Sequence, residues 1–195
     1  MTVPRSSVSH DRPATDEELL NKASDGNQWA FKRLVERYED QVAATVVGML
    51  GPGPEADDVG QETFIRFYEA MDQFRGEASL GTYLTRIAIN QSLKALRKRK
   101  RWYERFRSRD DEETFVDEPV QERSEAVEEG ERAELVHTAL QELSAHHRSV
   151  VVLRLLQGYS TKETAELLDV PEGTVMSRLY RATDHLEALL RLEPG

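Results

Sequence analysis

A run of positive charge followed directly by a run of negative charge divides this sequence into two parts. Residues 93–109 contain nine lysines and arginines against Glu104 alone, a net charge of +8. Residues 110–134 contain twelve acidic residues against Arg123 and Arg132, a net charge of −10. The acidic run has almost no apolar periodicity before Val127, so it is expected to be a flexible linker. The 195-residue length leaves room for two small domains, one on each side.

Apolar residues outside the linker recur every three or four positions, which is the spacing of one face of a helix. Capping boxes at residues 15–18 and 160–163 mark two helix starts. Gly51-Pro52-Gly53-Pro54 ends one helix and begins the next. No segment alternates as a strand would, so the sequence predicts an all-α fold of two small helical domains joined by a flexible acidic linker. The expected parts are a disordered tail (1–14), a first domain (15–104), a linker (105–131) and a second domain (132–192).

The helix expected after Pro54 has an apolar face and an acidic face. Its spacing turns Thr63, Phe64, Phe67, Tyr68 and Met71 inward. Acidic side chains beside an exposed apolar one are typical of a protein-docking surface, because rim charges orient a partner and the apolar centre supplies contact. The alternative is a solubilising helix face with no partner. The outward positions are Asp58, Gln61, Ile65, Glu69 and Asp72.

The helix expected after Ser79 carries hydrogen-bond donors beside its apolar stripe and runs into the basic block. The loop before it, residues 74–78, adds an aromatic ring and a cation. Cationic grooves with aromatic and amide groups suit unpaired bases, whose edges they hydrogen-bond. The alternative is a solvated helix face with a basic end. The donor stripe consists of Thr82, Arg86, Asn90, Lys94, Arg97 and Arg101.

The end of the chain predicts a helix-turn-helix, whose second helix fits the major groove of DNA. A short capped helix is followed by the turn Asp169-Val170-Pro171-Glu172-Gly173 and by a longer amphipathic helix. Arginine forks read guanine edges or clamp phosphate, and hydroxyl groups serve either target. The alternative is an ordinary helical hairpin, and the nearby Glu163, Glu166 and Asp169 favour modest DNA affinity. The outward face of the second helix holds Thr174, Ser177, Arg178, Arg181 and His185.

Several functions are disfavoured by what the sequence lacks. The absence of cysteine excludes disulfides, thiolate metal sites and a cysteine nucleophile. There is no His-Glu-x-x-His, Gly-rich phosphate loop or Gly-x-Ser-x-Gly motif, and the spacing of His137, His146 and His147 does not suit metal ligands. We therefore expect no catalysis, cofactor or metal. The longest apolar run, residues 42–50, is too short to cross a bilayer and no signal peptide is present, so a cytoplasmic location without membrane insertion is expected.

The order of these motifs resembles the sigma-70 family of RNA polymerase sigma factors, and the extracytoplasmic-function (ECF) class most closely. Asp57-Asp58-Val-Gly-Gln61-Glu62-Thr-Phe64, Phe74-Arg75-Gly76-Glu77-Ala78-Ser79 and Tyr83-Leu84-Thr-Arg86-Ile87-Ala88-Ile-Asn90 resemble its region 2. Leu143-Ser-Ala-His-His-Arg148, Ser160-Thr-Lys-Glu163-Thr-Ala165 and Gly173-Thr174-Val175-Met-Ser177-Arg178-Leu-Tyr-Arg181-Ala182 resemble its region 4. The likeness covers about residues 16–102 and 132–190.

The resemblance implies a transcription initiation factor that binds core RNA polymerase, at the clamp helices of its largest subunit and the flap of its second-largest, and directs it to promoter DNA. It also implies control by an anti-sigma factor. The polymerase-binding residues would be Asp57, Asp58, Gln61, Glu62, Ile65 and Glu69. The residues for the −10 element would be Phe74, Arg75, Gly76, Glu77, Ser79, Thr82, Tyr83, Arg86, Asn90, Lys94, Arg97 and Arg101. The residues for the −35 element would be Ser160, Thr161, Lys162, Thr174, Met176, Ser177, Arg178, Tyr180 and Arg181.

The sequence departs from the family pattern at three places. Tyr83 stands where the family usually has tryptophan, which keeps an aromatic ring but changes base stacking. Residues 144–147 replace the usual proline-bearing turn before Arg148. Met176 occupies a position that is often basic, so the −35 preference of relatives does not transfer.

Two other interpretations stay open at this point. A DNA-binding regulator with an N-terminal sensing domain explains the helix-turn-helix but not residues 57–90. The second is an adaptor that binds polymerase or another protein without touching DNA. If the chain is a sigma factor, we expect it to bind duplex poorly when free, because the acidic run can compete with DNA for the basic run beside it.

Overall fold

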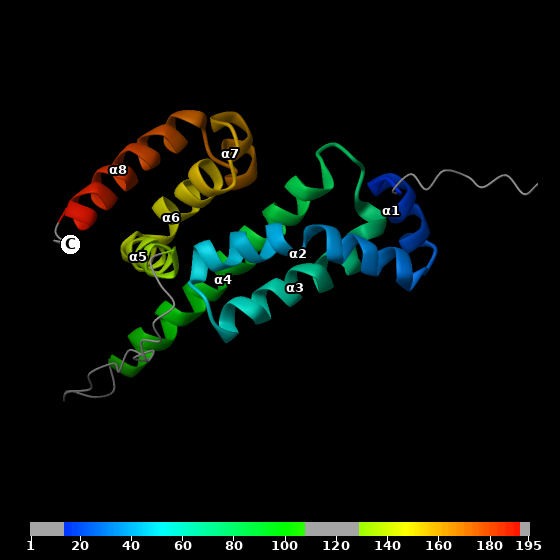
Figure 1. Ribbon diagram of the computed structural model, residues 1–195, viewed down its shortest axis with the longest axis horizontal. Helices are drawn as coiled ribbons and strands as arrows, with labels where there is room; N and C mark the ends of the chain where they lie inside the picture. Colours follow the sequence, from blue (N-terminus) through cyan, green and yellow to red (C-terminus); the bar gives the residue numbers. More distant parts are fainter. Residues whose placement is uncertain (1–13, 108–128, 192–195) are drawn as a thin grey trace, which may run out of the picture.

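The computed structural model describes residues 14–107 and 129–191, which form a series of helices (Figure 1). The expected tail, apart from Ala14, and most of the expected linker lie outside these residues. No residue within the two described ranges belongs to a strand. The predicted all-α class is therefore confirmed.

The first domain contains four α-helices and one 3₁₀ turn. They are α1 (Asp16–Ser24), α2 (Gln28–Leu50), α3 (Pro54–Ala70), the 3₁₀ turn Met71–Gln73, and α4 (Leu80–Arg107).

The second domain contains the other described helices, with one π-helical segment between them. They are α5 (Glu129–Glu142), α6 (Ala145–Val151), the π-helical segment Val152–Leu156, α7 (Thr161–Leu168) and α8 (Glu172–Arg191).

Local chemistry explains where these helices begin. The capping boxes expected at Thr15 and Ser160 are both formed, each satisfying main-chain donors of the first turn. Pro54 occupies the first turn of α3. The Oγ of Ser79 accepts a hydrogen bond of 3.1 Å from the main-chain nitrogen of Thr82, which caps α4.

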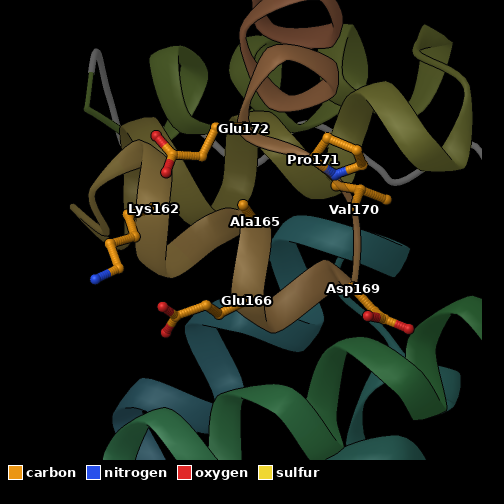
Figure 2. A pocket seen from close by; sticks show the side chains of 7 residues that line it. All are labelled: Lys162, Ala165, Glu166, Asp169, Val170, Pro171 and Glu172. Atoms are coloured by element: carbon orange, nitrogen blue, oxygen red, sulfur yellow. The ribbon is translucent and has the colours of Figure 1, made fainter.

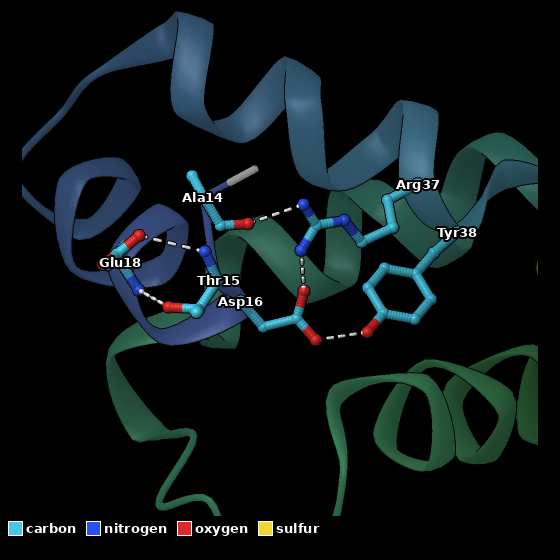
Figure 3. Close-up of polar contacts among 6 residues, drawn as sticks. All are labelled: Ala14, Thr15, Asp16, Glu18, Arg37 and Tyr38. Carbon is cyan, nitrogen blue, oxygen red and sulfur yellow. Dashed lines mark hydrogen bonds and ion pairs between the residues drawn. The ribbon is translucent and has the colours of Figure 1, made fainter. Parts of the chain in front are cut away.

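A polar cluster joins α2 to the first residue of α1 and to Ala14 just before it (Figure 3). The Arg37 guanidinium donates to the Asp16 carboxylate at 2.5 Å and to the carbonyl oxygen of Ala14 at 2.7 Å. The hydroxyl of Tyr38 donates to the other oxygen of the same carboxylate. Burial and the Asp16 carboxylate raise the pKa of Tyr38 to about 12.

The structure differs from two local expectations. α4 continues through the basic block to Arg107, where the linker was expected from residue 105, so the cations up to Arg101 lie on a continuous helix. Tyr68 was predicted to be buried but is 51% exposed. It lies at the edge of the inward face of α3, where the ring of Phe31 contacts it edge-on, 4.9 Å between centroids, and covers only part of it.

The two domains share one apolar core. Val152, Leu153 and Leu167 of the second domain belong to the same buried cluster as the core of the first domain. Gly48 of α2 permits this approach, because a Cβ there would lie 2.9 Å from a methyl group of Val152. The core of the second domain is completed by two smaller clusters, and their buried members are Leu140, Leu143, Val151 and Ala182, and Val150, Ala165 and Val175.

Polar contacts reinforce the domain interface. The Gln41 side-chain amide donates to the hydroxyl groups of Tyr159 and Thr85, at 3.1 Å each, and the Tyr159 hydroxyl lies 3.1 Å from that of Thr85. In Figure 1 the second domain accordingly lies along one side of α2 and α4. The linker joins two domains that are packed together, not two separate bodies.

Candidate nucleic-acid and polymerase interfaces

The outward face of α3 has the composition expected of a docking surface. All five outward positions named from the sequence are exposed, and Ile65 is 53% exposed at their centre. Asp57 is exposed as well, whereas Glu62 is half-buried and pairs with Arg66 at 2.7 Å. The face therefore offers exposed carboxylates around an apolar centre, with Glu62 paired to Arg66 of its own helix.

The donor stripe of α4 lies on the surface along most of the helix. Thr82 is half-buried, while Arg86, Asn90, Lys94, Arg97 and Arg101 are exposed. Since α4 is unbroken from Leu80 to Arg107, these side chains project from one rigid rod. Any phosphate or base contacts along it would therefore be in a defined register.

A surface hollow between α3 and α4 brings together residues that the sequence placed in different motifs. Its lining includes Glu69 of α3 and Tyr83, Ile87, Asn90 and Gln91 of α4. An aromatic ring, two amides, one carboxylate and the guanidinium of Arg66 thus surround one concave site. Such groups can stack on an unpaired base and hydrogen-bond its edge.

The loop before α4 adds a second aromatic ring beside this hollow. The ring of Phe74 lies 5.1 Å from that of Tyr83, and Phe67 lies 6.3 Å from Tyr83 on the core side. Gly76 has a φ of +70°, a left-handed conformation that favours glycine. Arg75, Glu77 and Ser79 are exposed, although the Ser79 hydroxyl is engaged in capping α4.

The helix-turn-helix predicted for the second domain is present. Asp169 ends α7 in the left-handed conformation, with a φ of 52°, and the main-chain nitrogen of Val170 bonds back to Ala165. Val150, Ala165 and Val175 pack beneath the turn. This packing sets the angle at which α8 leaves α7.

The outward side of α8 offers both polar and apolar groups. Tyr180 is 73% exposed and Met176 64% exposed, and Ser177 and Arg181 are also exposed. Thr174 and Arg178 are half-buried. These six residues from the −35 set therefore share one continuous helix.

The flank of the helix-turn-helix is acidic, as its sequence suggested. Figure 2 shows the hollow between α7 and the start of α8, where Lys162 is accompanied by Glu166, Asp169 and Glu172. Three carboxylates against one ammonium group repel phosphate, so DNA is expected to approach from the α8 side. Of the other −35 residues, Thr161 of α7 is half-buried, and Ser160, which precedes α7, accepts the capping bond from the main-chain nitrogen of Glu163.

The two predicted DNA surfaces touch each other in this conformation. The Arg86 guanidinium of α4 donates a hydrogen bond of 3.3 Å to the carbonyl oxygen of Glu166 on α7. A residue of the −10 set is thus engaged by the helix-turn-helix. The expected masking by the acidic run falls largely outside the described residues.

The sequence patterns did not single out Arg148, a buried cation of α6, as part of any interface. Arg148 is 4% exposed and bonds to four oxygen atoms, among them the carbonyl oxygen of Met49 in the first domain. Its place among the apolar residues of α6 was the available signal. Burial lowers the pKa of Arg148 to about 10, so it stays charged at neutral pH.

Comparisons with known proteins match both domains. The sigma-70 region 2 model matches residues 34–102, and the sigma-70 region 4 model matches residues 133–186. The RNA polymerase sigma-H factor of Pseudomonas aeruginosa is 33% identical over 186 residues, which cover 90% of this chain and 94% of that protein. The ECF RNA polymerase sigma-E factor of Salmonella typhimurium is 32% identical over 178 residues, which cover 89% and 93%.

Solved structures agree with this match. CnrH, in complex with the cytosolic domain of CnrY, superposes with a TM-score of 0.66 and 28% identity, covering 92% of this chain and 99% of its own. The sigma factor RpoE, in complex with the anti-sigma factor NepR from Bartonella quintana, gives a TM-score of 0.63 at 24% identity, covering 84% and 98%. The second likeness concerns the fold alone.

The chain belongs to the sigma-70 family of RNA polymerase sigma factors and, within it, to the ECF class. It is a transcription initiation factor that directs RNA polymerase to promoters. A regulator with an unrelated sensing domain is excluded, since residues 57–90 lie inside the region 2 match. An adaptor that does not touch DNA is excluded by the same family membership.

The described residues contain neither a membrane-spanning helix nor a metal-binding cluster. None of the described helices is both long and apolar enough to span a membrane. No group of three or more histidine or acidic side chains in residues 14–107 and 129–191 is arranged to hold a metal ion.

Proposed function

We propose that the chain opens promoter DNA by holding an unpaired base of the −10 element in the hollow between α3 and α4. The observation that carries this proposal is the meeting of Phe74, Tyr83 and Asn90, two aromatic rings and an amide, beside one concave site. The rings can stack on a base, and the Asn90 amide can read its edge. The exposed cations of α4, including Arg97 and Arg101, then neutralise the adjoining phosphates.

The same proposal assigns one partner to each remaining surface. The acidic face of α3, centred on Ile65, docks on the clamp helices of the largest polymerase subunit. The exposed face of α8 enters the major groove at the −35 element, and the second domain lies near the flap of the second-largest subunit. An anti-sigma factor regulates the chain, and its location is the cytoplasm. The chain itself needs no catalytic group, metal or cofactor for these steps.

Asn90→Ala tests the base-holding step. Promoters are first mapped as transcription starts that appear when the chain is overexpressed. Holoenzyme is then assembled on one of them, and permanganate footprinting measures the open bubble. We expect the free energy of open-complex formation to become less favourable by about 1–3 kcal/mol, the value of a base-edge contact. The affinity of the closed complex should change little.

The matched control is Asn21→Ala, since Asn21 is exposed on α1, away from the hollow. It should leave the bubble unchanged. An equal loss at the closed and open steps for Asn90→Ala would mean that Asn90 is structural, and the proposal would fail.

A further inference from the structure

Three of the five histidines of the chain gather beside the proposed recognition helix. His147 of α6 and Arg181 and His185 of α8 line one surface hollow. His146 precedes His147, and Arg178 lies one turn before Arg181 on α8. We call these five residues, His146, His147, Arg178, Arg181 and His185, the histidine–arginine patch.

The patch is poor in compensating negative charge. Asp184 is the acidic residue that lines the hollow, and no described residue forms an ion pair with Arg178 or Arg181. This concentration of cations stands out in a chain with a net charge of −10. Together with burial, the fields of the two arginines and of the other two histidines lower the pKa of His147.

The other elements packed on α6 bring charged groups that act on Arg148. α2 and α4 also contact α6, and Arg99 of α4 acts on the buried Arg148. Glu142 at the end of α5 likewise acts on Arg148. The groups that face His147 are therefore His146 on its own helix and Arg178, Arg181, Asp184 and His185 on α8.

The patch continues the face that α8 presents to DNA. Arg178, Arg181 and His185 lie three and four residues apart, so they share one side of the helix with Ser177. His147 borders the same side from α6. A duplex seated on α8 would bring its phosphates within reach of these rings.

We propose that the histidine–arginine patch is a pH-dependent phosphate clamp that extends the −35 interface from α8 onto α6. The inference rests on the proposed DNA-binding role of α8. A bound phosphate stabilises protonated imidazoles, whereas burial and the neighbouring arginines oppose protonation of His147 in the free protein. DNA binding therefore takes up protons, and affinity rises as the pH falls.

The size of the effect follows from linkage between binding and protonation. Each histidine that takes up a proton on binding makes affinity rise as the pH falls, by at most about tenfold per pH unit. Lysine and arginine keep their charge throughout this range, so they do not contribute to the change. The plot of log affinity against log salt concentration should also be steeper at pH 6, by up to about one unit of slope per histidine.

The experiment measures binding of the full chain to a short labelled duplex of random sequence by fluorescence anisotropy, at pH 6 and pH 8 and across a salt series. The test variant carries His146→Asn, His147→Asn and His185→Asn. A second variant changes only the exposed His146 and His185, which removes the risk that loss of the half-buried His147 disturbs folding. His137→Asn on α5, outside the patch, is the matched control.

We expect wild type and His137→Asn to bind at least about fivefold more tightly at pH 6 than at pH 8. The double variant should lose most of that gain and the triple variant nearly all of it. An unchanged pH response in both variants, together with the expected loss of promoter opening for Asn90→Ala, would overturn the clamp alone. Absence of wild-type binding even at pH 6 and low salt would overturn the clamp alone, because the free chain is already expected to bind duplex poorly.

Discussion

The guanidinium of Arg148 donates a hydrogen bond of 2.5 Å to the main-chain carbonyl oxygen of Met49, 99 residues earlier in the sequence. Met49 lies in the last turn of α2, where helix carbonyls have no intrahelical partner and the helix dipole favours a cation. The same side chain bonds the carbonyl oxygens of Gln141 and Leu143. One buried cation thus caps a helix of the first domain and braces the α5–α6 turn of the second.

Arg148→Met is expected to lower the free energy of unfolding by about 3 kcal/mol or more. The substitution keeps the apolar stem but leaves several buried carbonyl oxygens without a donor. Urea denaturation followed by circular dichroism measures the loss. Arg33→Met, which removes an exposed pair with Glu36 within α2, serves as the control and should cost no more than about 0.5 kcal/mol. A similar loss for both arginines would mean that the interdomain cap contributes little.

Gly48→Ala is expected to disturb the domain interface. The added Cβ would approach Val152 to 2.9 Å, and the cost, about 1–3 kcal/mol, exceeds the helix-propensity gain of about 0.5–1 kcal/mol. Small-angle X-ray scattering should show a larger radius of gyration, because the second domain loosens from α2.

Gly60→Ala is the matched change for this test. Gly60 also lies inside a helix, but an added Cβ there meets no atom within 4 Å. It should raise the free energy of unfolding by about 0.5–1 kcal/mol and leave the radius of gyration unchanged. Identical scattering for wild type and Gly48→Ala would argue against a tight contact at this point.

Tyr38→Phe is expected to make the free energy of unfolding depend less on pH in the alkaline range. The folded state raises the pKa of Tyr38 from 10 to about 12 by burial and by the bond to Asp16. The unfolded state therefore loses this proton first, and the stabilisation is complete below pH 10 and lost as the pH rises toward 12. Since the side chain is partly exposed, we expect a contribution of about 1 kcal/mol.

Urea unfolding at pH 8, 10 and 11 measures this contribution. Wild type and Tyr38→Phe should converge in stability as the pH rises, after differing at pH 8. Parallel curves would mean that the hydroxyl bond to Asp16 does not stabilise the folded state.

The double variant Asp58→Arg and Gln61→Ala is expected to weaken binding to core RNA polymerase. Both positions are exposed beside Ile65, and a reversed charge at a complementary surface costs up to several kcal/mol at close contact. Competition with a labelled sigma factor for core polymerase measures the loss. Glu39→Arg on the exposed side of α2 should compete as wild type does, and the helical circular-dichroism signal should persist in both. Undiminished competition by the double variant would contradict the assignment of α3.

The helix starts and the direction of most faces could be predicted from the sequence. Caps such as Thr15 and Ser160 act within three residues, and apolar spacing within one helix tells which side is inward. The exposed positions around Ile65 and the helix-turn-helix itself are local patterns of this kind, and they were predicted correctly. The roles of the individual site residues are still predictions, to be tested as described above.

What only the tertiary structure decided involves residues far apart in the sequence. Local periodicity predicted that Tyr68 is buried. The helices that pack on α3 do not cover the whole apolar face, so about half of the Tyr68 side chain stays exposed to solvent. Nothing near Arg148 in the sequence shows that its guanidinium bonds the carbonyl oxygen of Met49. Nor does the sequence show that Gly48 packs against Val152. Helix formation depends on neighbours within about one turn, whereas the pairing of helices depends on which surfaces can exclude water together. For that reason the sequence determined the helices and their faces, and the packing decided that the two domains share one core.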